Sequence, residues 1–204
     1  MNDPSSIMLF AATEFRLNMF DAVLVGLVGY GIWRGKQEGF SGEHMGLLQW
    51  SLISLPGGNM AGALGAVFEG LFSTSLYWGQ ILGFVLWAAM VVGGFSFLAS
   101  KGKFELGDGD TFGRFEYPLG ILGGAIKNFC ILLAVISLLN GRYYTAEQIA
   151  ASRAAQVKEF GSALIPTPSL LSQNVFQSSF FGPKIKKYMS WAMLTPIPKG
   201  TPRR

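Results

Sequence analysis

The sequence predicts an all-α polytopic membrane protein with about four transmembrane helices and a short helical tail outside the membrane. Half of the 204 residues are hydrophobic, and only 14% are charged, against about 25% in soluble domains. Several apolar runs reach the roughly 20 residues that cross a bilayer core of about 30 Å. Glycine, frequent in membrane helices, occurs 27 times. We expect an N-terminal segment (1–16), a transmembrane domain (17–140) and a tail with a disordered end (141–204).

The first apolar run covers residues 17–33. Asp21 lies near its start, where a carboxylate meets the positive end of the helix dipole. We therefore expect Asp21 to have a structural role. Arg34 and Gly35 follow the run directly, and we expect them to end the first helix and open a polar loop over residues 34–43.

The second run, residues 45–68, is interrupted by four residues that disfavour a helix: Pro56, Gly57, Gly58 and Asn59. Proline removes a backbone donor, and glycine lowers helix propensity. We expect a break or strong kink here. Broken membrane helices must be buried in protein or line a cavity, and in transporters such breaks form substrate sites. A kinked helix, a pair of short re-entrant pieces and a functional break all remain open.

The third and fourth runs cover residues 76–100 and 117–140. The fourth contains Gly120 and Gly124 in a G-x-x-x-G spacing, which lets helix backbones approach closely in lipid. Lys127 lies one turn further on. A lysine there survives by snorkelling to the headgroups or by facing a partner or wet cavity, so it is either an anchor or a functional charge.

Four further features describe the tail. Thr145 and Gln148 form a capping-box pattern that predicts a helix over residues 146–160. A second helix is expected over residues 169–181. Lysines alternate with apolar and aromatic residues over residues 183–194, which is typical of a helix lying in the headgroup plane, although a partner-binding helix is the rival interpretation. Residues 195–204 are expected to be disordered.

Several classes of function find no support in the sequence. The net charge of +4 comes from scattered basic residues, not from the dense stripe that nucleic-acid binding requires. Glu38, Glu43 and the single His44 lack ligand spacing for a metal. The single Cys130 precludes an intramolecular disulfide and a cysteine cluster. We expect no cofactor and no catalytic group.

The stretch from Leu119 to Lys127 resembles the last transmembrane helix of the colicin V production protein family, which typically reads L-G-x-x-x-G-x-x-[RK]-G. Asn128 stands where a glycine is usual in that family. Asp21 and the Arg34-Gly35 pair are similar to family features at the start and end of the first helix, although Lys36 stands where an aromatic or aliphatic residue is usual.

This resemblance implies a multi-pass bacterial inner-membrane protein. Such a protein would assist toxin production or export, or envelope homeostasis, without catalysis. Its expected partners are the lipid bilayer and either further copies of the chain or other membrane proteins. The alternative is an oligomeric channel or small transporter that uses Lys127 and the break at Pro56.

Overall fold

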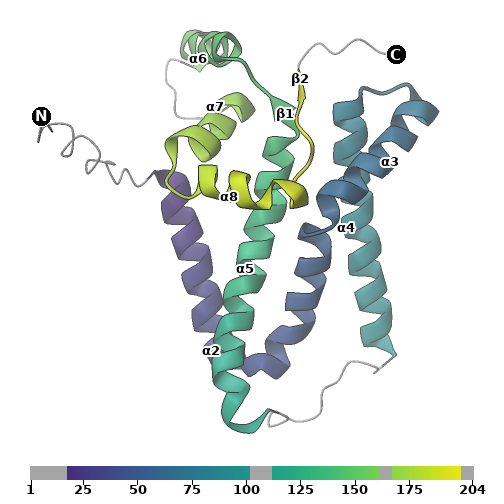
Figure 1. The fold of residues 1–204 in the computed structure, drawn as a ribbon, viewed down its shortest axis with the longest axis vertical. Helices are drawn as coiled ribbons and strands as arrows, with labels where there is room; N and C mark the ends of the chain where they lie inside the picture. Colours follow the sequence, from purple (N-terminus) through teal and green to yellow (C-terminus); the bar gives the residue numbers. More distant parts are fainter. Residues whose placement is uncertain (1–17, 102–111, 161–166, 199–204) are drawn as a thin grey trace, which may run out of the picture.

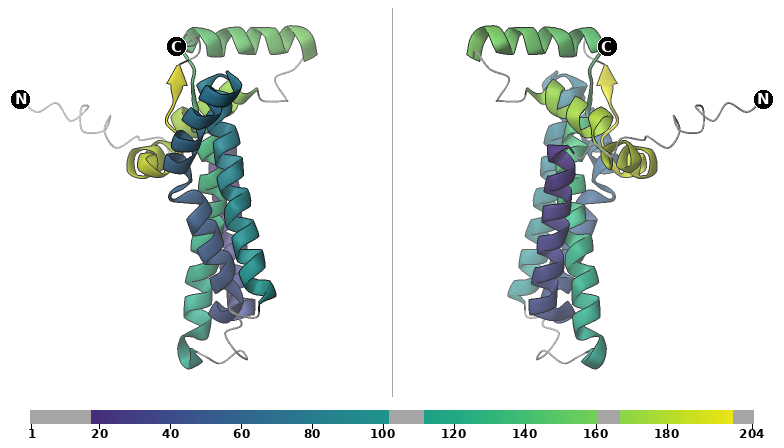
Figure 2. Two further views of the ribbon diagram at one scale, coloured as in Figure 1. Left: turned by 90° about the vertical axis from the view of Figure 1, so that its right-hand side faces the viewer. Right: turned by 90° about the vertical axis from the view of Figure 1, so that its left-hand side faces the viewer.

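The computed structural model describes residues 18–101, 112–160 and 167–198, so the predicted N-terminal segment lies outside the described residues. The described chain is mostly helical, and the all-α prediction is confirmed (Figure 1). Long helices form an upright bundle, and shorter elements gather at one end of it (Figures 1 and 2). The long helices are α2 (Met19–Ser54), α3 (Gly57–Phe72), α4 (Leu76–Ser100) and α5 (Glu116–Asn140).

Helix α2 reverses its direction at Gly39, whose φ of 68° and ψ of −178° are not helical. The two halves of α2 both pack against α5, and they run along it in opposite directions. Gly31, Gly35 and Gly39 contact successively earlier residues of α5, whereas Gly46 and Ser51 contact successively later ones. Figure 1 shows the resulting hairpin, with α5 packed against both halves. The sequence prediction of a polar loop over residues 34–43 is therefore wrong, because helix continues on both sides of one glycine.

The predicted break in the second run is present. Helix α2 ends at Ser54, α3 begins at Gly57, and the two helices are bent by 49°. By length and apolar composition, Leu76–Ser100 and Gly113–Asn140 could each cross a membrane, and the bent pair α2 and α3 adds a third candidate if counted as one span. Two to three candidate spans therefore support a membrane protein.

Helices α3 and α4 form a second close pair. A Cβ atom on Gly65 would lie 2.8 Å from the backbone nitrogen of Gln80, and one on Gly79 would lie 2.6 Å from the carbonyl oxygen of Gly65. Such contacts require bare backbone on both helices. Gly93 and Gly94, further along α4, have open space beside them, and the helix is continuous there.

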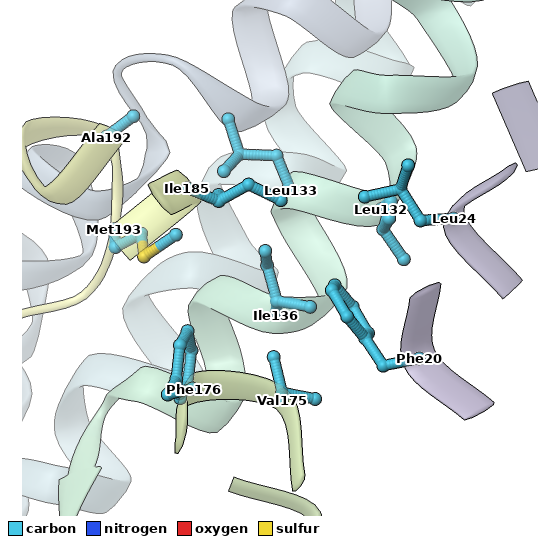
Figure 3. Close-up of a cluster of buried hydrophobic side chains, with 10 residues drawn as sticks. All are labelled: Phe20, Leu24, Leu132, Leu133, Ile136, Val175, Phe176, Ile185, Ala192 and Met193. Carbon is cyan, nitrogen blue, oxygen red and sulfur yellow. The ribbon is translucent and has the colours of Figure 1, made fainter. Parts of the chain in front are cut away.

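The tail packs onto the bundle. Its elements are β1 (Arg142–Tyr143), α6 (Ala146–Phe160), α7 (Pro168–Gln173), a π-helical turn (Asn174–Ser178), α8 (Gly182–Met189), a 3₁₀ turn (Ser190–Ala192) and β2 (Ile197–Pro198). Figure 1 shows α8 lying across α5, and Figure 2 shows α6 extending sideways beyond the bundle. Figure 3 shows the core that joins tail and bundle: Phe20, Leu24, Leu132, Leu133, Ile136, Val175, Phe176, Ile185, Ala192 and Met193.

Local sequence signals predict parts of this tail correctly. The Thr145 and Gln148 capping box is confirmed, with reciprocal hydrogen bonds of 3.4 and 3.3 Å, and α6 has the predicted bounds. The predicted helix over residues 169–181 is present in part: α7 continues from Asn174 as a π-helical turn and ends at Ser178, three residues earlier than predicted. The prediction of disorder is wrong for Ile197 and Pro198, which pair in parallel with Arg142 and Tyr143. Residues 199–204 lie outside the described part.

Candidate functional site

The site is built where α2 and α5 approach through glycine. A side chain on Gly31 would overlap the carbonyl oxygen of Gly124, and one on Gly35 would overlap that of Gly120. The reverse contacts are equally tight. This confirms the close approach predicted for Gly120 and Gly124, and it places Gly35 in the helix interface. The prediction that Arg34 and Gly35 end the first helix is wrong.

The close contact between α2 and α5 brings two opposite charges together, one on the second half of α2 and one on α5. The Lys127 ammonium donates a hydrogen bond to Glu43 Oε2. Glu43 is 1% exposed and Lys127 is 8% exposed, and Gly46 leaves room for the lysine stem, since a Cβ there would lie 3.0 Å from Lys127 Cδ. Lys127 is therefore not a snorkelling anchor. Burial of a charge is tolerated here because each group neutralises the other.

Arg34 connects this buried pair to the surface. Its Nε donates a 2.7 Å hydrogen bond to Glu38 and lies 3.6 Å from Glu43 Oε1. Because the second distance exceeds hydrogen-bond length, Glu43 Oε1 gains electrostatic contact and no hydrogen bond. Arg34 and Glu38 are about two-fifths exposed. The four side chains thus form a charge row running from the surface into the bundle.

A second polar contact holds the hairpin turn. Glu116 Oε1 accepts a 2.6 Å hydrogen bond from the backbone nitrogen of Ser41, two residues after Gly39. His44 contacts the carbonyl oxygen of Ser41 through Nδ1 at 2.6 Å. Among the described residues, no group of three or more His, Cys, Asp and Glu side chains could hold a metal ion. The Glu116 contact therefore ties α5 to the turn of α2, and the His44 contact lies within α2.

The break at Pro56 is filled by protein. A Cβ on Gly57 would lie 2.7 Å from the Phe84 ring, and one on Gly58 would overlap the carbonyl oxygen of Met193. Asn59 is exposed on the outer side. The break therefore meets α4 and the tail, which satisfies the requirement that such backbone be covered.

Asp21 has the structural role predicted for it, and a wider one. Its carboxylate accepts a 3.0 Å hydrogen bond from the Asn18 backbone, completing a capping box. The same carboxylate accepts bonds of 2.9 and 3.0 Å from the backbone nitrogens of Phe180 and Phe181 in the tail. Asp21 is fully buried. One side chain therefore starts α2 and anchors the tail to it.

The structure brings Arg34, Gly35, Gly120, Gly124 and Lys127 into one region, while Asp21 and the break lie elsewhere. Sequence reasoning missed Glu43 as the partner of Lys127. The spacing of Gly31, Gly35 and Gly39, which matches the Gly120 and Gly124 spacing, was the signal that could have revealed the pairing. Comparisons with protein-family models, curated proteins and solved structures find no match to this chain.

Proposed function

We propose that this chain is a four-pass inner-membrane protein of the colicin V production type. It acts without catalysis, as a structural component that supports toxin production or export or the homeostasis of the envelope. The sequence resemblance at Leu119 to Lys127 supports the family, and the hairpin at Gly39 supports the fourth pass. The observation that carries the proposal is the surface of α4.

Helix α4 carries no Asp, Glu, Lys or Arg over its 25 residues, and its outward side chains are large and apolar. Trp78, Val85, Met90 and Phe97 are each at least half exposed. A contiguous apolar surface of this kind is unstable in water and marks a membrane or protein contact. In a bilayer, lipid chains would cover this apolar surface, so no partner protein is needed to shield it.

A structural role is favoured by the way that the polar groups of the bundle are used. Lys127 neutralises Glu43, Glu116 holds the hairpin turn, and Phe84 and Met193 fill the break. The charges of Lys127 and Glu43 neutralise each other, and all of these contacts hold helices in place.

A channel or small transporter is the second candidate, and one observation favours it. The charge row reaches from exposed Arg34 and Glu38 to buried Lys127, and Glu43 Oε1 has no hydrogen-bond partner within the described residues. Intramembrane charges of this kind mark ion pathways in other proteins. Four helices enclose little space, so this function would require an oligomer.

A paired experiment separates the two candidates. Full-length protein is reconstituted in liposomes, and fluxes of H⁺, K⁺ and Na⁺ are measured for wild type and for Glu43→Gln. In parallel, the gene is deleted in its host and complemented with either form, and envelope permeability and toxin secretion are measured. A structural component gives a deletion phenotype and no flux. Flux that Glu43→Gln abolishes, with the protein still inserted, would establish the transporter instead.

A further inference from the structure

A small pocket lies where the end of α5 meets the tail. It has a volume of about 80 Å³ and lies between the ends of α5 and β1 on one side and the α7 and α8 region on the other. Sites for drug-sized ligands have volumes of about 300–1,000 Å³. This pocket is therefore suited to one small polar group.

Two cations line the pocket without an acidic neighbour. Arg142 and Lys186 contribute to its wall together with Asn140, Tyr144 and Gln177, and no Asp or Glu does so. Within the described residues, the ion pairs involve other side chains. The described contacts of the two cations are with aromatic residues. The Arg142 guanidinium carbon lies 5.1 Å from the centre of the Tyr77 ring and 5.9 Å from that of Tyr144, and Arg142 also hydrogen-bonds the Tyr144 side chain. Lys186 Nζ lies 5.0 Å from the centre of the Phe176 ring. Burial raises the pKa of the Tyr144 phenol, which keeps this hydroxyl neutral.

We propose that this pocket binds a phosphate group. A guanidinium presents a planar fork of donors that matches phosphate oxygens, and an ammonium adds a point charge. Both residues line one small volume that has no acidic residue in its wall, which favours an anion there. Neutral donors from Tyr144 and Gln177 complete the set of groups that a phosphate accepts from.

The phosphate belongs either to a lipid headgroup or to a soluble compound. Helix α8 lies across α5 (Figure 1), which orients it along the plane of a bilayer that α5 would cross. Lys184 and Lys187 on α8 are exposed, as is Trp191 just beyond it. Lysines and tryptophan are typical of the headgroup region. Binding of a lipid headgroup rests on the proposed membrane location, whereas binding of a soluble phosphate compound does not.

Arg142 also follows the C-terminal end of α5, where a cation is favourable without any ligand. The experiment must therefore separate pocket binding from helix-end and general surface electrostatics. Arg142→Gln is paired with Arg153→Gln on α6, and Lys186→Gln is paired with Lys187→Gln on α8. Each variant lowers the net charge by one, and the control positions do not line the pocket. Arg142→Lys keeps the charge and removes the fork.

Two probes are used with the full-length protein. In the first arm, nanodiscs of phosphatidylcholine contain increasing phosphatidylglycerol, and native mass spectrometry counts the phosphatidylglycerol retained per chain. In the second arm, inorganic phosphate is titrated into delipidated protein in detergent, with chloride at equal ionic strength as reference, and thermal unfolding reports binding. Size-exclusion profiles and proteolysis of the tail check the fold of each variant. A carbonate wash of the source membranes tests the membrane location separately.

We expect Arg142→Gln and Lys186→Gln each to weaken binding roughly tenfold or more, because each removes a charge-assisted hydrogen bond. Arg142→Lys should lie between wild type and Arg142→Gln, and both controls should bind like wild type. Retention of phosphatidylglycerol without a response to inorganic phosphate identifies a headgroup, and a response to inorganic phosphate identifies a soluble ligand. The proposal is overturned if neither probe binds, or if control and pocket variants weaken binding equally.

Discussion

Helices α4 and α5 have nearly equal hydropathy and opposite surroundings. Each contains an apolar window long enough to cross a membrane, yet 11% of that window is buried in α4 and 56% in α5. Helix α5 contacts both halves of α2 and the tail, whereas α4 packs chiefly against α3. Both helices pack through glycine, α4 through Gly79 and α5 through Gly120 and Gly124, but only α5 also carries a buried charge, Lys127, toward its neighbours. Similar hydropathy therefore does not indicate which of the two helices is central.

The largest effect should come from adding a side chain at a glycine of the α2 and α5 contact. Gly124→Val places methyl groups against the Gly31 carbonyl oxygen, so the helices must separate. We expect a loss of more than about 4 kcal/mol in the free energy of unfolding, which is exceptional for one substitution. Gly93→Val on α4, where no atom lies within 4 Å, is the control and should be nearly silent. Unfolding by SDS, followed by circular dichroism, measures both. Equal loss in the two variants would mean that α4 is packed as tightly as α5.

Removing one charge of the buried pair should come next. Lys127→Met removes the ammonium that pairs with buried Glu43 and leaves Arg34, 3.6 Å away, as its nearest described cation, at a cost of about 3–5 kcal/mol. The double variant Lys127→Met with Glu43→Gln removes both charges and should recover much of that loss. The same SDS titration, arranged as a double-mutant cycle, measures the coupling. A silent Lys127→Met would contradict the buried pair and restore the snorkelling interpretation.

A smaller effect is expected where the tail joins α2. Asp21→Asn keeps the shape of the side chain but removes the charge that accepts from three backbone nitrogens. We expect about 1.5–3 kcal/mol of destabilisation and faster proteolysis of the tail. Glu147→Gln, an exposed carboxylate in the first turn of α6, should change stability by less than about 0.5 kcal/mol. Limited proteolysis read by mass spectrometry locates the cleavage. Unchanged cleavage in Asp21→Asn would show that the tail is held by its apolar core alone.

The smallest effect concerns the polar link between α4 and α2. Trp87 Nε1 donates a 2.9 Å hydrogen bond to the Leu52 carbonyl oxygen. Trp87→Phe keeps an aromatic ring and removes the donor, and about 1 kcal/mol should be lost. Trp78→Phe is the matched control, since Trp78 is 59% exposed and should tolerate the change. A difference above about 3 kcal/mol would indicate that α4 is held to α2 far more firmly than its contacts suggest.

Local signals explain why part of this fold was predictable. The bounds of α4 and α6 follow from an uninterrupted apolar run and a capping box, and the break follows from Pro56 and two glycines. Each of these features depends on residues close together in the chain, so a single sequence is enough to predict it.

Contacts between distant residues account for what sequence reasoning missed. The charged residues before Glu43, namely Arg34, Lys36 and Glu38, predict a polar loop, and only the reversal at Gly39 brings Glu43 to Lys127. Phe180 and Phe181 donate to Asp21 through the backbone, which carries no sequence signal. Predicting the partner of a buried charge therefore requires knowing which helices pack together.

The central claim is that α5 forms the core of the bundle while α4 faces lipid. Wild-type protein in nanodiscs, labelled by a lipid-soluble photoactivatable carbene reagent and mapped by mass spectrometry, tests it without any substitution. We predict strong labelling along α4, including Val85, Met90 and Phe97, and labelling of α5 restricted to outward residues such as Leu122 and Val135, with Leu133 and Ile136 unlabelled. Equal labelling of the two helices, or protection of α4 with labelling of Leu133 and Ile136, would contradict the account.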